Sequence, residues 1–124
     1  MKCPKCQAEM KKIELEGVEV DRCTGCYGIW FDFQEQQQLK ATPGAQRIDS
    51  GDAAVGEKMN LIDIINCPRD GSRLTRMVDR QQPHLWYEAC PVCYGVFFDA
   101  GEFRDYSTRT LIESIRDLFP RERP

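Results

Sequence analysis

The spacing of the cysteines constrains this sequence more than any other feature. Of seven cysteines, six form pairs separated by two residues, and the seventh, Cys67, stands alone; the pairs are Cys3/Cys6, Cys23/Cys26 and Cys90/Cys93. The N-terminal residues lack the apolar stretch of a secretory signal, so we expect a cytoplasmic protein with reduced thiols. An odd count of reduced cysteines in close pairs favours metal ligation over disulfides.

The cysteines belong to a pattern that occurs twice in the chain. Residues 1–40 contain Cys3-Pro4-Lys5-Cys6 and then Cys23-Thr24-Gly25-Cys26-Tyr27-Gly28-Ile29-Trp30-Phe31-Asp32 with Glu35. Residues 67–106 contain Cys67-Pro68-Arg69-Asp70 and then Cys90-Pro91-Val92-Cys93-Tyr94-Gly95-Val96-Phe97-Phe98-Asp99 with Glu102. Equivalent residues of the two copies are 64 positions apart before the predicted hairpin and 67 positions apart after it, so the second copy has three extra residues in between. We therefore predict two modules, residues 1–40 and 58–106.

Each module is expected to contain a β-hairpin between its two groups of ligands. In the first, apolar and polar residues alternate on both sides of Glu16-Gly17, over residues 13–15 and 18–20. In the second, residues 74–78 face residues 85–88 across a longer turn. The alignment of the copies places Trp86 at the position of Glu19, so Trp86 is predicted to lie on the wetter face of the hairpin.

The first module has the spacing of a zinc site with four cysteine ligands. Two tight Cys-x2-Cys turns at opposite ends of a hairpin can direct their sulfurs at one tetrahedral ion. A module of this size buries too little apolar surface to fold alone, whereas a structural zinc ion contributes about 10 to 16 kcal/mol in finger peptides. We predict a structural site of Cys3, Cys6, Cys23 and Cys26.

The second module has Asp70 where the first has Cys6. A carboxylate oxygen also binds zinc, so a second site of Cys67, Asp70, Cys90 and Cys93 is predicted, giving two zinc ions per chain. The alternative is that Asp70 only caps the turn at Pro68–Gly71, with water or His84 completing the site.

With these residues in view, the chain resembles the bacterial zinc-finger family described as transcription factor IIB-type. Residues 3–39 carry its pattern nearly throughout, and residues 67–106 carry it with Phe97 in place of Trp and Asp70 in place of Cys. The resemblance implies a small metal-stabilised α+β fold: two tandem zinc ribbons, with zinc at the matching cysteines and a short helix after each ribbon. It implies little about activity, because ribbons serve unrelated roles.

Four acidic residues near the ends of the ribbons invite comparison with catalytic carboxylates. They form the pairs Asp32/Glu35 and Asp99/Glu102, each placed where a helix N-cap and its reciprocating acid belong. Phe98 and Phe103 also match the positions of a hydrophobic staple. We expect helix capping, and we expect no enzyme activity.

The remaining segments are a linker and a C-terminal tail. Residues 41–57, with several glycines and no sustained periodicity, are predicted to be a linker, and residues 58–66 a strand or short helix. Residues 107–124 are predicted to contain an amphipathic helix that covers the second module or packs on another chain. A protein partner or a second copy would then contact Leu111, Ile112, Ile115, Leu118, Phe119 and Trp86.

The net charge helps to rank the functions that remain possible for a zinc-binding protein. The formal net charge is −3, and the sequence contains no apolar run long enough for a membrane span. The leading hypothesis is a non-catalytic zinc-binding module, a small regulatory or transcription-related factor that acts by protein contact. Nucleic-acid binding is the alternative, supported by an arginine-rich second half, and a redox or metal sensor is the third.

Overall fold

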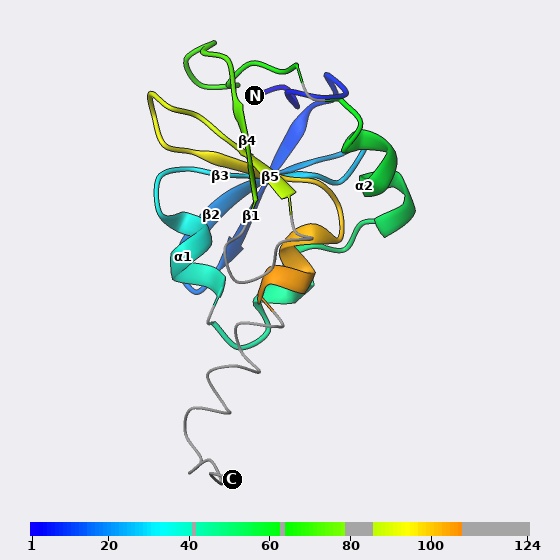
Figure 1. Ribbon diagram of the computed structural model, residues 1–124. Helices are drawn as coiled ribbons and strands as arrows, with labels where there is room; N and C mark the ends of the chain where they lie inside the picture. The colour runs from blue at the N-terminus through cyan, green and yellow to red at the C-terminus, as the bar shows by residue number, and fades with distance from the viewer. Residues whose placement is uncertain (41, 63, 79–85, 108–124) are drawn as a thin grey trace, which may run out of the picture.

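The computed structural model describes residues 1–40, 42–62, 64–78 and 86–107 (Figure 1). The strands are β1 (Met10–Leu15), β2 (Val18–Cys23), β3 (Ile29–Phe31), β4 (Thr75–Val78), β5 (Trp86–Ala89) and β6 (Val96–Phe98). The helical elements are α1 (Glu35–Lys40), the 3-10 helix η1 (Ala45–Ile48) and α2 (Ala53–Met59), followed by a helical segment at residues 102–107. The α+β class predicted from the sequence is confirmed.

Both predicted hairpins are present as antiparallel strand pairs. In β1 and β2, Ile13 pairs with Val20 and Leu15 pairs with Val18, around a turn at Glu16 and Gly17. In β4 and β5, Val78 pairs with Trp86. The Trp86 side chain is 38% exposed, as predicted, although Glu88, two residues along the same strand, is buried.

The two modules join edge to edge in one six-stranded sheet of order β1-β2-β3-β6-β5-β4. The junction is the antiparallel pairing of β3 with β6, in which Trp30 lies opposite Phe97, its own counterpart in the repeat. The other pairings repeat with the same offsets: Asp21 pairs with Trp30 as Glu88 pairs with Phe97. The copies are therefore related by an approximate twofold axis between Trp30 and Phe97.

Two equivalent glycines allow the modules to approach closely at this axis. A Cβ atom on Gly28 would lie 2.3 Å from the Phe97 ring, and a Cβ atom on Gly95 would lie 2.2 Å from the Trp30 ring. Each aromatic residue thus packs over the glycine of the opposite module. The Gly-x-Trp and Gly-x-Phe pairs of the sequence form the junction between the copies.

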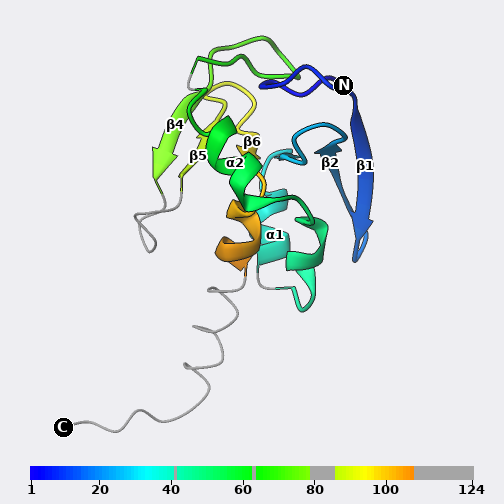
Figure 2. The same cartoon turned by 90° about the vertical axis from the view of Figure 1, so that its right-hand side faces the viewer.

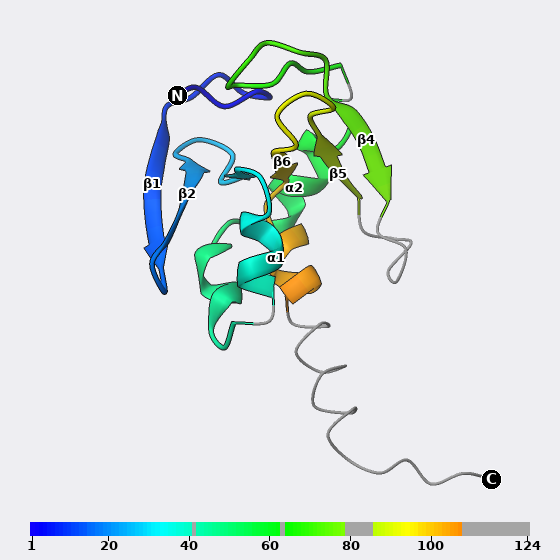
Figure 3. The ribbon, with the colours of Figure 1, turned by 90° about the vertical axis from the view of Figure 1, so that its left-hand side faces the viewer.

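Apolar side chains cover both faces of the sheet near the axis. One buried cluster contains Phe31, Phe98 and Phe103 together with Leu39 and Ile48, and a second contains Trp30 and Phe97 with buried cysteines. Figures 2 and 3 show α1 and the 102–107 helix lying between the β1–β2 hairpin and the β4–β5 hairpin. The α1 and 102–107 helices therefore cover one buried cluster, and the metal-ligand turns and α2 cover the other.

The segment between the modules is more ordered than the sequence predicted. Residues 41–57 were expected to be a linker, yet they contain η1 and most of α2, and Ala45, Ile48 and Asp49 are buried. Glycine content and weak periodicity gave no sign of these short helices, which tertiary contacts stabilise. Of residues 58–66, those that the structure describes form no strand: α2 ends at Met59, and Asn66 forms an isolated β-bridge with Arg73.

The predicted C-terminal contact helix, with Leu111, Ile112, Ile115, Leu118 and Phe119, lies outside the described residues, as does His84. Among the residues that the structure does describe, no helix has the length and apolar character needed to cross a membrane.

Candidate metal centres

The four cysteines of the first module meet at one point. Cys3 and Cys6 lie in the N-terminal turn, Cys23 ends β2 and Cys26 follows it, and all four sulfurs lie within 4.8 Å of one another. The Sγ atoms of Cys3 and Cys26 are 3.7 Å apart, and those of Cys6 and Cys23 are 3.2 Å apart. Sulfurs 2.3 Å from a tetrahedral zinc ion stand about 3.8 Å from one another. This cluster could hold a zinc ion.

Backbone N–H groups surround the sulfurs of this cluster. The N–H of Lys5 points at Cys3 Sγ, at 3.4 Å, and the N–H groups of Gly25 and Cys26 point at Cys23 Sγ, at 3.2 and 3.4 Å. Such donors stabilise thiolates and orient them as ligands. The cluster is thus prepared for the charged form that binds zinc.

The pKa values of Cys6 and Cys23 move in opposite directions, which shows that burial in this cluster disfavours a second thiolate beside the first. Burial, reinforced by a hydrogen bond with Cys6, raises the pKa of Cys23 to about 11. Burial of Cys6 opposes its ionisation, but hydrogen bonds, led by that of the Ala8 backbone, lower the pKa of Cys6 to about 7. A divalent ion removes this conflict by compensating the negative charge of all four sulfurs.

The second module repeats this arrangement with Asp70 as the fourth member. Cys67, Asp70, Cys90 and Cys93 bring their ligand atoms within 4.8 Å of one another. Cys67 Sγ lies 3.7 Å from Cys93 Sγ, and Cys90 Sγ lies 3.4 Å from Asp70 Oδ2, close to the separation of about 3.5 Å expected for a sulfur and an oxygen on one zinc ion. This cluster could therefore hold a second zinc ion.

The two interpretations of Asp70 are compatible. Its Oδ1 atom accepts a hydrogen bond of 2.8 Å from the N–H of Ser72, which is the turn cap, while Oδ2 faces Cys90. The bond from Ser72 lowers the pKa of Asp70, so the carboxylate is ionised and ready to bind a cation. Capping the turn fixes the orientation in which Asp70 joins the cysteines.

With both centres in place, the chain can be compared with known proteins. Residues 2–42 match the TFIIB-type zinc-ribbon family described as "Transcription factor zinc-finger". The match includes all four cysteines of the first centre and stops before the second. No curated protein and no solved structure matches the chain. The second centre is thus identified as zinc-ribbon-like by the repeat and its geometry.

In each metal-ligand turn, a basic side chain forms ion pairs with carboxylates of the opposite module. Lys5 Nζ lies 2.8 Å from Glu88 Oε1 and 2.7 Å from Asp99 Oδ2, and all three side chains are buried. The equivalent Arg69 lies 3.3 Å from Asp21 and 2.8 Å from Asp32, at a more exposed location. These ion pairs connect each metal centre to the strands of the other copy.

Three of the four carboxylates first compared with catalytic acids, Asp32, Glu35 and Asp99, make hydrogen bonds within the chain. Glu35 Oε1 accepts a 2.7 Å hydrogen bond from the N–H of Asp32, as a capping box predicts. The Asp32 side chain, however, accepts from Trp30 Nε1 and from Arg69 in place of the helix N–H groups. Asp99 likewise binds Lys5, and the Phe98 and Phe103 rings of the predicted staple lie 5.8 Å apart.

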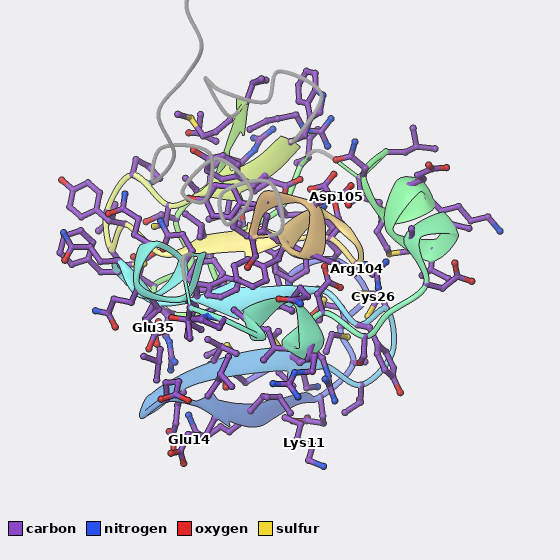
Figure 4. All side chains as sticks on the ribbon, turned by 90° about the horizontal axis from the view of Figure 1, so that it is seen from below. Lys11, Glu14, Cys26, Glu35, Arg104 and Asp105 are labelled. Atoms are coloured by element: carbon purple, nitrogen blue, oxygen red, sulfur yellow. The ribbon has the colours of Figure 1, made fainter. Side chains whose placement is uncertain are left out.

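The backbone N–H groups at the start of the 102–107 helix donate hydrogen bonds to a residue that the sequence analysis did not identify. Asp49, just after η1, accepts hydrogen bonds of 2.9 Å from the N–H groups of Gly101 and Arg104. Arg104, which Figure 4 shows on the side of Cys26 and away from Glu35, also donates to the Asp49 carbonyl. A lone Asp in a glycine-containing segment carries no signal of this role.

The Lys5 and Arg69 ion pairs could have been suspected from the sequence, because both modules have a basic residue directly after Cys-Pro.

Proposed function

We propose that this protein is a non-catalytic module with two structural zinc ions, and that it acts as a small regulatory or transcription-related factor by contact with other proteins. The observation that carries the proposal is that each centre has a complete set of four donors supplied by the chain. Structural zinc sites are closed in this way, whereas catalytic zinc sites keep a position open for water or substrate.

The use of the arginines favours protein contact over nucleic-acid binding. Three arginines of the second half are engaged within the chain: Arg69 with Asp21 and Asp32, Arg76 with Glu88, and Arg104 with Asp49. A phosphate backbone would have to compete with these carboxylates and carbonyls. The formal net charge of −3 adds to this disadvantage.

The test is affinity capture from a nuclease-treated lysate with the zinc-loaded chain as bait and the chelator-stripped chain as control. We expect the zinc-loaded chain alone to retain a specific protein. Retention that nuclease abolishes, together with tight binding of an oligonucleotide at physiological salt, would assign the chain to nucleic-acid binding and overturn the proposal.

A further inference from the structure

The approximate twofold axis gives each surface formed by the repeated modules a counterpart on the other side. One such pair of surfaces differs, because α2 covers one member and not the other. On the first side, Tyr27 and Ala100 lie beneath the segment that leads into α2: a Cβ atom on Gly51 would lie 2.6 Å from Tyr27 and 2.7 Å from Ala100. The equivalent residues on the other side are Tyr94 and Phe33. Tyr27 and Ala100 are 39% and 3% exposed, whereas Tyr94 and Phe33 are 61% and 58% exposed.

The helix α2 contacts the first side through two kinds of groups. Its apolar residues Val55 and Met59, four apart and so on one face, pack against the cluster that contains Trp30 and Phe97. At its C-terminal end, the carbonyl of Met59 accepts a 3.1 Å hydrogen bond from Lys5 Nζ, and the carbonyl of Asn60 accepts one from Arg76. Two cations thus bind the last carbonyl groups of a helix, where the helix dipole is negative.

The repeat places the same two cations on the other side. Arg69 is the counterpart of Lys5, and Lys12 is the counterpart of Arg76; both contact the buried Asp21, as Lys5 and Arg76 both contact Glu88. The Arg69 and Lys12 side chains are 40% and 63% exposed, whereas that of Lys5 is fully buried. Lys5 pairs with two carboxylates and still donates to the Met59 carbonyl, so the carboxylate partners of Arg69 and Lys12 leave these partly exposed cations accessible to a helix terminus on this side.

The apolar part of the open side is also arranged for contact. The Phe33 and Tyr94 rings come from different modules and lie 5.8 Å apart, which makes one continuous aromatic surface across the junction. Phe33 replaces Ala100, so a helix on this side would rest on an aromatic ring, whereas α2 approaches the Ala100 backbone closely through Gly56.

We propose that the open surface, formed by Lys12, Phe33, Arg69 and Tyr94, binds the C-terminal turn of an amphipathic helix of a protein partner. The last carbonyl groups of that helix accept hydrogen bonds from Arg69 and Lys12, and apolar side chains one turn apart contact Phe33 and Tyr94. The arrangement on the first side, with α2 in place, is the template for this complex. The inference rests on the proposed function, because it names the surface and the kind of partner.

The probe is a synthetic peptide of residues 50–62 that carries Gly56→Ala. The substitution favours the helix, and it prevents the peptide from displacing α2, because the added Cβ would lie 2.0 Å from the Ala100 carbonyl oxygen. The matched control peptide adds Val55→Asp and Met59→Asp. Binding is followed by amide chemical shifts of the zinc-loaded full chain.

We expect concentration-dependent shifts at Phe33, Tyr94 and Arg69, with Tyr27 unaffected. In the chain, Phe33→Asp should weaken binding by about tenfold or more, whereas Leu61→Asp, at an exposed apolar residue elsewhere, should leave binding unchanged. The inference is wrong if millimolar peptide causes no such shifts or if Phe33→Asp has no effect.

Two further results would assign the surface to another occupant and overturn the inference. One is a contact in the full chain between Phe33 or Tyr94 and residues 108–124, and the other is a dimer that Phe33→Asp dissociates. Affinity capture separates this inference from the proposed function: a partner still retained by the Phe33→Asp chain leaves the function intact and refutes only the surface.

Discussion

The ion pairs at Lys5 and Arg69 offer a matched test of how burial sets the strength of an interaction. The two cations occupy equivalent positions, and each contacts two carboxylates of the opposite module. The side chains of Lys5 and both its partners are at most 1% exposed, so Lys5→Met leaves two carboxylates buried with little compensation, at a cost of about 3 to 5 kcal/mol. Arg69 and Asp32 are about two-fifths exposed, and the buried Asp21 keeps Lys12 at 3.7 Å, so Arg69→Met should cost less, about 1 to 2 kcal/mol.

The assay is urea unfolding of the zinc-loaded variants at one fixed concentration of free zinc, with native mass spectrometry to verify that each variant binds the same number of ions. Adding Asp99→Asn to Lys5→Met should recover part of the loss, because it removes one of the uncompensated charges. Equal losses for the two single variants, or a larger loss for Arg69→Met, would refute the reasoning that burial decides the difference.

Three other predictions address the junction, the second centre and the pH dependence. Gly28→Ala should destabilise the fold by about 1 to 3 kcal/mol in thermal unfolding, because its Cβ would overlap the Phe97 ring; a cost that does not fall in a Phe97→Leu background would contradict this cause. Asp70→Ala should reduce the zinc content from two ions to one by native mass spectrometry, and two retained ions would show that Asp70 is only a turn cap. Burial, helped by nearby carboxylates, raises the pKa of Glu102 to about 8, so the native state favours the protonated form and loses stability as pH rises from about 4.3 through 8. Glu102→Gln should therefore gain about 2 to 4 kcal/mol over the natural chain between pH 5 and pH 9, and a gap that does not change with pH would exclude this origin.

The sequence was most informative where local spacing determines the structure. The Cys-x2-Cys turns, the hairpin around Glu16-Gly17 and the inclusion of Asp70 all follow from residues close together in the chain, and the structure contains each of them. The pairing of β3 with β6 could not be predicted in this way, because Trp30 and Phe97 are buried apolar residues in either a joined or a separate pair of modules. Their glycine neighbours, Gly28 and Gly95, carried the only local sign of a close approach.

The short helices in the segment between the modules could not be predicted for a related reason. They have little intrinsic stability, and α2 depends on contacts with Lys5 and Ala100 that are distant in sequence. Asp49 is buried only because the first turn of the 102–107 helix lies against it. Contacts between residues far apart in the chain leave no periodic pattern or motif in the sequence, and a residue such as Asp49 looks like any other isolated polar residue.

The pairing of Trp30 with Phe97 across the twofold axis has a consequence for the history of the chain. An antiparallel junction in which the central residue meets its own counterpart, and the flanking pairs Ile29/Phe98 and Phe31/Val96 are equivalent to each other, is the interface that two identical subunits would form. A chain with a single copy of the motif could build the same sheet as a homodimer, and covalent fusion of two copies would fix that partnership. Within one chain the two halves can also differ, as they do where Asp70 stands in place of Cys6 and Phe97 in place of Trp30. The protein can thus be understood as an internal dimer in which, among the described residues, α2 covers one side of the twofold axis.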